Sequence, residues 1–191
     1  MTQTWLAPER AELATRHILD VAEGLFVEHG VAAVTMRQLA TAAGCSRATL
    51  YRYFPGKAEV LAAYVERGTA DLATQIGSAV AAHTDPGRRL LAAVMTAVTG
   101  VRGNPALAAW FTTEAAGLAA HLALLSPAIE QVTVDFLTEL LPSATHDDLR
   151  DRARWLVRVM VSLLGSPGAS ADDERAMLER FVVPVVVEPH P

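Results

Sequence analysis

The sequence TMRQLATAAGCSRATLYRYFPGK, residues 35–57, holds four cationic side chains and no acidic one. The whole chain of 191 residues has the opposite character, with a formal net charge of −5. A local reversal of charge is typical of a surface that contacts phosphate groups. This stretch is therefore the first candidate for a nucleic-acid contact.

The first half of the stretch predicts a short helix with a marked beginning and end. Thr35 followed by Gln38 forms a capping box, because the hydroxyl and the amide each bond a backbone N–H that lacks a partner at a helix start. A helix is therefore expected to begin at Met36. Gly44 is expected to end it by adopting the left-handed backbone conformation that glycine tolerates.

The second half predicts another short helix directly after this turn. Ser46 can cap residues 47–53, and Pro55 followed by Gly56 then breaks the helix. Two short helices joined by a tight turn form a helix-turn-helix, whose second helix enters the major groove of DNA. Arginines on that helix can form paired hydrogen bonds with guanine, Thr and Ala can contact thymine methyl groups, and tyrosines can reach phosphates.

The residues predicted to contact DNA lie on this second helix or beside it. Lys57, the only lysine in the chain, follows the break at the start of a new helix, where its ammonium and the free backbone N–H groups can attract one phosphate. The predicted DNA-binding residues are Thr35, Arg37, Ser46, Arg47, Ala48, Thr49, Tyr51, Arg52, Tyr53 and Lys57.

These motifs together resemble the DNA-binding signature of TetR/AcrR-family transcriptional regulators. The resemblance runs over roughly residues 14–61 without a gap and includes VTMRQLA at 34–40, AGCS at 43–46 and TLYRYFPGK at 49–57. It implies an all-helical homodimer with an N-terminal three-helix DNA-binding domain and a larger C-terminal domain for ligand binding and dimerisation. The resemblance also implies DNA contacts at the positions where the family tends to make them, which in this chain are Thr35, Arg47, Thr49, Tyr51, Tyr53 and Lys57.

We predict an all-α fold of about nine helices, divided into a helix-turn-helix DNA-binding domain over residues 1–56 and a helical ligand-binding and dimerisation domain over residues 57–191. A first helix from about Glu9 to His29 should cover the helix-turn-helix, and a long helix should follow Gly56. The run Val182–Val187 is β-branched and is the one segment that an extended conformation would also suit. Further helix starts are signalled at Asp85, Asn104, Ser126, Thr145 and Ser170.

Charge and composition agree with this division. Residues 1–68 carry seven basic and seven acidic side chains, whereas residues 69–191 carry nine basic and fourteen acidic ones, a difference of −5. The second part should therefore repel DNA. Because the chain has no apolar run long enough to cross a bilayer, no evident signal peptide and a single cysteine, we expect a cytoplasmic protein without a membrane partner.

Two helices of the second part have apolar side chains on two faces, so that one face can serve the core and the other a second copy of the chain. The alternative, in which both faces are buried within one subunit, stays open. The predicted dimer-interface residues are Trp155, Val159, Leu163, Met177 and Phe181.

The segment 90–141 is where a cavity for a small apolar ligand is expected, since its side chains are of the types that line such pockets. Each of them also suits an ordinary helical core, so that alternative stays open as well. The candidate ligand-binding residues are Met95, Trp110, Phe111, Glu114, His121, Leu122 and Phe136.

Other chemistry has little support in the sequence. The six histidines show no metal-ligand spacing, so we expect neither a metal site nor another cofactor. Cys45 reads as a small turn residue in preference to a redox switch, because no second cysteine exists. Arg150, Arg154 and Arg158 indicate a solvated helix face, with an anion site as the weaker interpretation.

The sequence therefore predicts a transcriptional regulator, most simply a ligand-responsive repressor that binds a palindromic operator as a dimer. One alternative is an architectural DNA-binding protein with little sequence preference, which the acidic second part disfavours. The other is an enzyme, which the absence of a convergent acid, base or nucleophile set disfavours, so we expect no catalysis.

Overall fold

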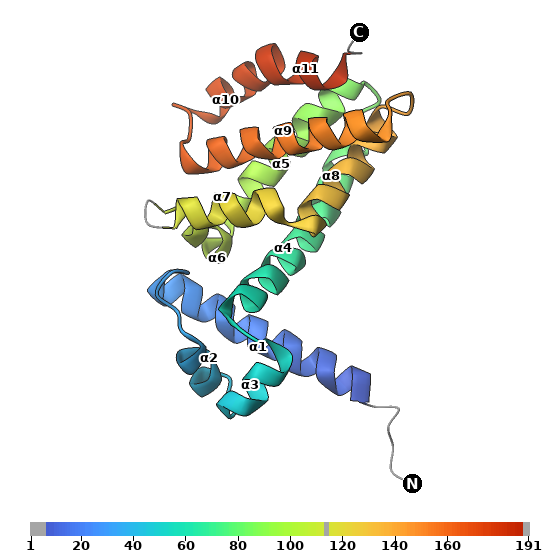
Figure 1. The fold of residues 1–191 in the computed structure, drawn as a ribbon. Coiled ribbons are helices and arrows are strands. Elements are labelled where there is room, and N and C mark those ends of the chain that lie inside the picture. Colours follow the sequence, from blue (N-terminus) through green and yellow to red (C-terminus); the bar gives the residue numbers. More distant parts are fainter. Residues whose placement is uncertain (1–6, 113–114, 189–191) are drawn as a thin grey trace. The chain divides into compact units, whose positions relative to one another are not determined.

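Residues 7–112 and 115–188 are described by the computed structural model, and within these ranges every regular element is a helix (Figure 1). The predicted all-α fold is thus confirmed. In chain order the elements are α1 Ala7–His29, α2 Met36–Ala42, α3 Arg47–Tyr53, α4 Lys57–Val80, α5 Pro86–Gly103, α6 Pro105–Ala108, the short 3₁₀ turn η1 Ala109–Phe111, α7 Ala116–Leu125, α8 Pro127–Leu140, α9 His146–Gly165, α10 Ala171–Met177, the π-helical η2 Leu178–Val182, and α11 Val183–Val187.

The chain divides into two units, Met1–Tyr64 and Val65–Pro191. In the first unit, which we call the head, Leu39 of α2 and Leu50 of α3 are fully buried. Phe26 of α1 meets Tyr64 edge to face, with ring centroids 5.4 Å apart. The start of α4 therefore contributes to the core of the head, whereas the sequence analysis placed the domain boundary at the Pro-Gly break before it.

The predicted helix starts are confirmed where a side chain caps the helix. The hydroxyl of Thr35 accepts a hydrogen bond from the backbone N–H of Gln38, and Asp85 accepts one from Arg88. The same device begins the helices that follow Ser46, Asn104, Ser126, Thr145 and Ser170.

One helix was missed, and one ambiguous segment is now assigned. The helix α7 was not predicted because the residue before it, Ala115, has no side-chain oxygen to cap it. The β-branched run Val182–Val187 is helical. Its Pro184 lacks an N–H, and the π-turn before it, where the N–H of Val183 bonds the carbonyl of Leu178, adjusts the helix to the proline.

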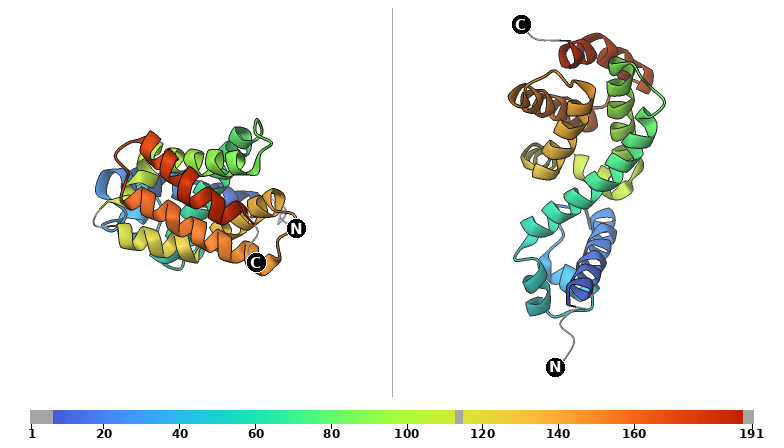
Figure 2. Two further views of the ribbon diagram at one scale, coloured as in Figure 1. Left: turned by 90° about the horizontal axis from the view of Figure 1, so that it is seen from above. Right: turned by 90° about the vertical axis from the view of Figure 1, so that its right-hand side faces the viewer.

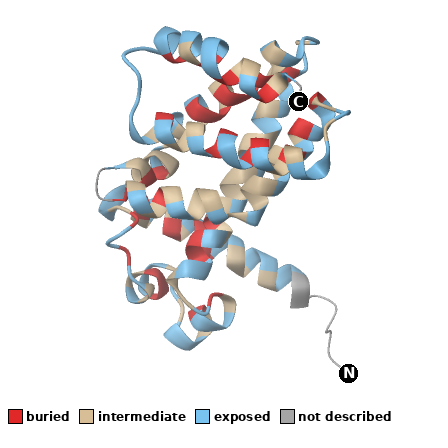
Figure 3. Ribbon diagram, turned by 45° about the horizontal axis from the view of Figure 1, so that its top comes forward, coloured by how far each residue is buried: buried red, intermediate tan, exposed pale blue. Residues whose placement is uncertain are grey.

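The core of the second unit forms where α5, α8 and α9 pack together and the C-terminal helices cover them. The further views in Figure 2 show the segment α10–α11 lying along α5 and α9. Figure 3 shows buried residues on the inward sides of the helices of each unit and exposed residues on the outward sides. Leu90 and Leu137 are fully buried at the centre of this core, and α11 contributes Val186.

A buried arginine of α9 links this helix to the C-terminal helix α11 by hydrogen bonds. Arg152, only 7% exposed, donates to the carboxylate of Asp148 one turn earlier at 2.8 Å. Its guanidinium also donates to the backbone carbonyls of Val186 and Glu188. Cations at a helix C-terminus satisfy the last carbonyl groups and interact favourably with the helix dipole. Arg152 therefore stabilises the end of α11.

A second ionic contact joins α5 to α10. The guanidinium of Arg102 bonds both carboxylate oxygens of Glu174, at 2.8 and 2.7 Å, and donates to the carbonyl of Leu163. Glu174 is almost fully buried and also accepts a hydrogen bond from the N–H of Gly168. The hydrogen bonds from Arg102 hold the pKa of Glu174 below its ordinary value of 4.5.

This pair generates a stability prediction. Arg102→Met should lower the free energy of unfolding by about 3 kcal/mol, because it leaves a buried carboxylate without its cation. Since the pKa of Glu174 is lowered in the folded protein, its contribution is complete above roughly pH 5 and is lost as pH falls through the folded pKa. Urea denaturation across pH checks both expectations. In Glu174→Gln the part of the acid destabilisation that comes from this carboxylate should be absent, and an unchanged acid profile would contradict the assignment.

Candidate functional site

The turn between α2 and α3 has a defined hydrogen-bonding pattern. Gly44 has a φ of +65°, which an L side chain rarely adopts. The N–H of Cys45 bonds the carbonyl of Ala40, and the N–H of Gly44 bonds that of Thr41. This 6→1 and 5→2 pair is a Schellman motif, which ends α2 sharply. The chain is thereby turned so that only three residues, 44–46, separate Ala43 from the start of α3 at Arg47.

The hydroxyl of Ser46 fixes the start of α3. It accepts a hydrogen bond from the backbone N–H of Thr49 at 3.0 Å, and its oxygen lies 2.9 Å from the Thr49 hydroxyl oxygen. Leu50 is fully buried on the inner side of α3. A helix capped at one end and held by a buried leucine has its rotation fixed, so the opposite side is the one left outside.

All ten predicted DNA-contacting residues keep accessible surface, since none of them is buried. Thr49, Tyr53 and Lys57 are half-buried and the other seven are exposed. The guanidinium of Arg52 lies 5.3 Å from the ring centroid of Tyr53, a cation–π geometry that restrains both side chains. The surface is thus cationic, accessible and partly preorganised, and its role in binding DNA stays a prediction.

Lys57 has a second connection that the sequence did not reveal. Its ammonium donates to the backbone carbonyl of Ala32, in the loop between α1 and α2, at 2.8 Å. Partial burial lowers the pKa of Lys57. Because an ammonium has three donors, two remain for a phosphate. The contact holds the charge beside the helix-turn-helix, where the predicted phosphate contact requires it.

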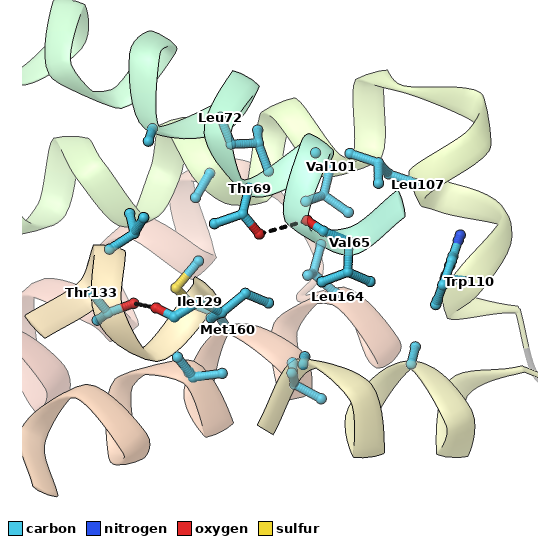
Figure 4. A pocket seen from close by; sticks show the side chains of 18 of the residues that line it. Val65, Thr69, Leu72, Val101, Leu107, Trp110, Ile129, Thr133, Met160 and Leu164 are labelled. Carbon is cyan, nitrogen blue, oxygen red and sulfur yellow. Dashed lines mark hydrogen bonds between the residues drawn. The ribbon is translucent and has the colours of Figure 1, made fainter. Parts of the chain in front are cut away.

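The second unit contains a cavity of about 160 Å³ whose walls come from α4 to α9 (Figure 4). Its lining is almost entirely aliphatic and aromatic. Figure 4 shows the hydroxyls of Thr69 and Thr133 directed at the carbonyls of Val65 and Ile129, to which they donate at 2.8 and 2.7 Å. A second cavity, of about 250 Å³, is lined by α4, α5, α8 and α9.

The structure brings together only some of the candidate ligand residues. Trp110 and Phe111 line the first cavity and Phe136 lines the second. Met95 packs against the core, and His121, Leu122 and Met95 line neither cavity. Glu114 lies outside the described residues.

Sequence reasoning missed the wall that α4 supplies. The residues of this wall recur at helical spacing in the sequence of α4. That periodic stripe was the signal that could have revealed them. The missed residues are Val65, Thr69, Leu72 and Ile76.

The five candidate dimer residues are in different environments. Trp155 and Phe181 are 37% and 58% exposed, so both keep apolar surface that a partner could cover. Val159 and Met177 are half-buried against the core. Leu163 is buried in the chain's own core, in one cluster with Leu178 and Val182 of the C-terminal segment, so it has almost no surface left for a partner.

The remaining candidate features are accounted for locally. Arg150 forms an ion pair with Glu130 at 2.8 Å, and Arg154 lies 3.7 Å from the same carboxylate, which favours the solvated-face interpretation of these arginines. Among residues 7–112 and 115–188, no group of three or more His, Cys, Asp or Glu is placed to hold a metal ion. In the same ranges no single helix is long and apolar enough to cross a membrane; α7 and α8 pass that test only as a pair, bent by 58°.

Comparison with known proteins identifies relatives of the whole chain. Residues 18–64 match the family model described as bacterial regulatory proteins, tetR family. Over 182 residues the chain is 45% identical to the uncharacterized HTH-type transcriptional regulator Rv1255c of Mycobacterium tuberculosis, covering 95% of this chain and 90% of that protein.

Solved structures share the fold at lower identity. The TetR family repressor AlkX from Dietzia sp. strain DQ12-45-1b, implicated in biodegradation of n-alkanes, aligns with a TM-score of 0.64 at 23% identity over 90% of this chain and 94% of its own. RolR in complex with resorcinol aligns with a TM-score of 0.67 at 17% identity over 96% and 98%.

The cap of α3 can be tested directly. Ser46→Ala should lower the stability of the head by about 1 kcal/mol, because the N–H of Thr49 loses its hydrogen-bond partner. Hydrogen exchange at the Thr49 amide should rise accordingly, as measured by NMR. Ser78→Ala is the matched control, since the Ser78 hydroxyl only donates to the carbonyl of Thr74 inside α4. Equal protection of the Thr49 amide in the wild type and Ser46→Ala would show that the cap does not hold α3.

Proposed function

Because this chain belongs to the TetR family of bacterial transcriptional regulators, we propose that it is a ligand-responsive repressor that binds a palindromic operator as a homodimer. The observation that carries the proposal is the accessible cationic face of α3, fixed by the cap at Ser46 and the buried Leu50. A helix presented in this way suits the width of the DNA major groove.

The residues of this face divide into two proposed roles. Arg47 lies in the first turn of α3, where helix-turn-helix proteins reach base edges, and is the proposed reader of guanine. Lys57 and the tyrosine hydroxyls are proposed to contact phosphates, which position the protein without reading sequence. Ala48 and Thr49 are proposed to contact thymine methyl groups.

Dimerisation would give the operator its symmetry. Two heads related by a two-fold axis would read half-sites about 34–36 Å apart, which is one turn of DNA. The exposed Trp155 of α9 and Phe181 of η2 are the proposed centre of the interface between the two copies. The proposed site of action is the cytoplasm, where bacterial DNA lies, and the proposed activity is binding without catalysis.

The ligand would act through the cavities of the second unit. The structural neighbour RolR is known in complex with resorcinol, which supports a small-molecule effector for this chain. Such a ligand can shift operator occupancy only by its different affinity for the DNA-bound and free forms. We propose that it favours a form that binds the operator weakly.

Selection of bound fragments from the source genome would supply the operator, and the division of roles can then be tested on it. Arg47→Ala should weaken operator binding about tenfold or more and reduce the preference for operator over random DNA. Lys57→Ala should weaken binding to both DNAs similarly and reduce the slope of log affinity against log salt concentration by about 1. Fluorescence anisotropy at several salt concentrations measures both effects.

The matched control for these variants is Arg88→Ala, which removes the same charge from an exposed site on α5 in the second unit, away from the proposed interface residues Trp155 and Phe181. It should leave both affinities unchanged. Because Lys57 also bonds Ala32, thermal unfolding of Lys57→Ala should accompany the titration. Equal losses on operator and random DNA for Arg47→Ala would refute its assignment as a base reader.

The dimer can be tested separately. Trp155→Glu and Phe181→Glu should each shift the protein toward monomer and weaken operator binding, because a charge placed in an apolar interface has no partner there. Sedimentation velocity measures the shift. Leu125→Glu changes a side chain that is 66% exposed on α7, outside the proposed interface, and should leave the dimer intact. Wild-type dimerisation in both interface variants would place the interface elsewhere.

A further inference from the structure

The two cavities of the second unit share one wall. The residues common to both linings are Ala73, Ile76, Ala97, Val132, Thr133 and Met160. The cavities are therefore adjacent compartments, and the unbranched and flexible side chain of Met160 lines both of them. Along α4 the lining extends from Val65 to Val80, which corresponds to about 22 Å at the helical rise of 1.5 Å per residue. A molecule that fills both compartments must be long and narrow.

The lining also restricts the charge of the occupant. The first cavity has no ionic side chain among its lining residues, and in the second Glu139 is the sole ionic one. Glu139 is 73% exposed and pairs with Arg89, the nearest atoms being 3.6 Å apart. An anionic ligand would meet no cation among the lining residues, and burying an uncompensated charge is costly.

Hydrogen bonding inside the first cavity is limited in the same way. The hydroxyl protons of Thr69 and Thr133 are committed to backbone carbonyls of their own helices, so these side chains offer a ligand only acceptor lone pairs (Figure 4). The indole N–H of Trp110 is the other polar side-chain group of this lining, and the rest of the wall is suited to hydrocarbon.

From this geometry, and resting on the proposed function, we infer that the effector is an uncharged alkyl-chain molecule that lies along α4 and occupies both cavities. Its hydrocarbon portion fills the first cavity and crosses the wall at Met160. Its other end lies in the second cavity, toward the solvent-exposed Glu139. A compact aromatic molecule can be held by the almost entirely apolar first cavity without the second, since an apolar cavity of about 150 Å³ is large enough for benzene.

Isothermal titration calorimetry of the full chain with n-decanol, decanoate and toluene tests this inference. We expect n-decanol to bind at least about tenfold more tightly than decanoate at neutral pH, because only the alcohol enters without carrying a charge. In a series of shorter n-alcohols the affinity should rise about fourfold per methylene, the equivalent of about 0.8 kcal/mol for each buried CH₂. Equal affinities for decanol and decanoate would overturn the inference, as would no dependence on chain length.

Cavity-blocking variants test whether one ligand spans both compartments. Gly77 lines the second cavity at an exposed position, and a Cβ built there meets nothing within 4 Å, so Gly77→Leu should place an apolar side chain at this cavity without a clash. It should weaken n-decanol about tenfold and leave toluene unchanged. Ala123→Leu, in the first cavity, should weaken both.

The matched control is Gly117→Leu, at an exposed site on α7 that lines neither cavity. It should bind both probes like the wild type. Full decanol affinity in Gly77→Leu would show that the ligand does not span the wall and would overturn the inference.

Operator binding by the same protein separates this inference from the proposed function. If the operator is bound but n-decanol and its homologues are not, the inference about the ligand fails while the DNA-binding role stands. If n-decanol binds as described but leaves operator affinity unchanged, the cavity assignment stands and the ligand response in the proposed function fails.

Discussion

The orientation of α3 depends on how the chain turns between Gly44 and Ser46. Gly44 has positive φ, yet a Cβ built at that position meets nothing within 4 Å. The requirement for glycine is therefore one of backbone conformation and not of space. Once the Schellman motif has ended α2, the cap at Ser46 begins α3, and Leu50 is drawn into the core of the head. These local contacts alone are sufficient to place Arg47 and Arg52 on the solvent-exposed side of α3, and no ligand or partner is required for that orientation.

Positive charge is used differently in the two units. In the second unit Arg102 and Arg152 are bonded within the unit. Arg102 pairs with the buried carboxylate of Glu174, and Arg152 donates to backbone carbonyls at the end of the C-terminal helix. Arg150 is engaged with Glu130 on a neighbouring helix. In the head, the arginines of α3 are exposed. The acidic balance of the second unit and the exposed cations of the head are consistent with the proposal that DNA binds to the head.

The sequence predicted those features that depend on a few adjacent residues. Helix starts at Thr35, Ser46 and Asp85 could be predicted because a side-chain oxygen and the N–H that it caps lie three residues apart. The helix α7 has no such signal, since it follows Ala115. The outward face of α3 followed from its caps and from helical periodicity, both of which are local.

Features that depend on distant segments could not be predicted in this way. Leu163 lies on an apolar face of α9 that suits a partner or a core equally well. Its burial follows from the packing of segments that are distant in the sequence. For the same reason the periodicity of segment 90–141 could not distinguish Phe136, which lines a cavity, from Met95, which packs beside it. The contact of Lys57 with Ala32 joins residues 25 positions apart and has no sequence signature.

The most direct test of this account is a hydroxyl-radical footprint of the protein on an operator selected from the source genome. If the exposed face of α3 reads DNA from two symmetric heads, the footprint should show two protected major-groove segments about 34–36 Å apart, at protein concentrations that leave random DNA unprotected. Uniform protection of operator and random DNA at the same concentration, or a single protected segment without a symmetric partner, would contradict it.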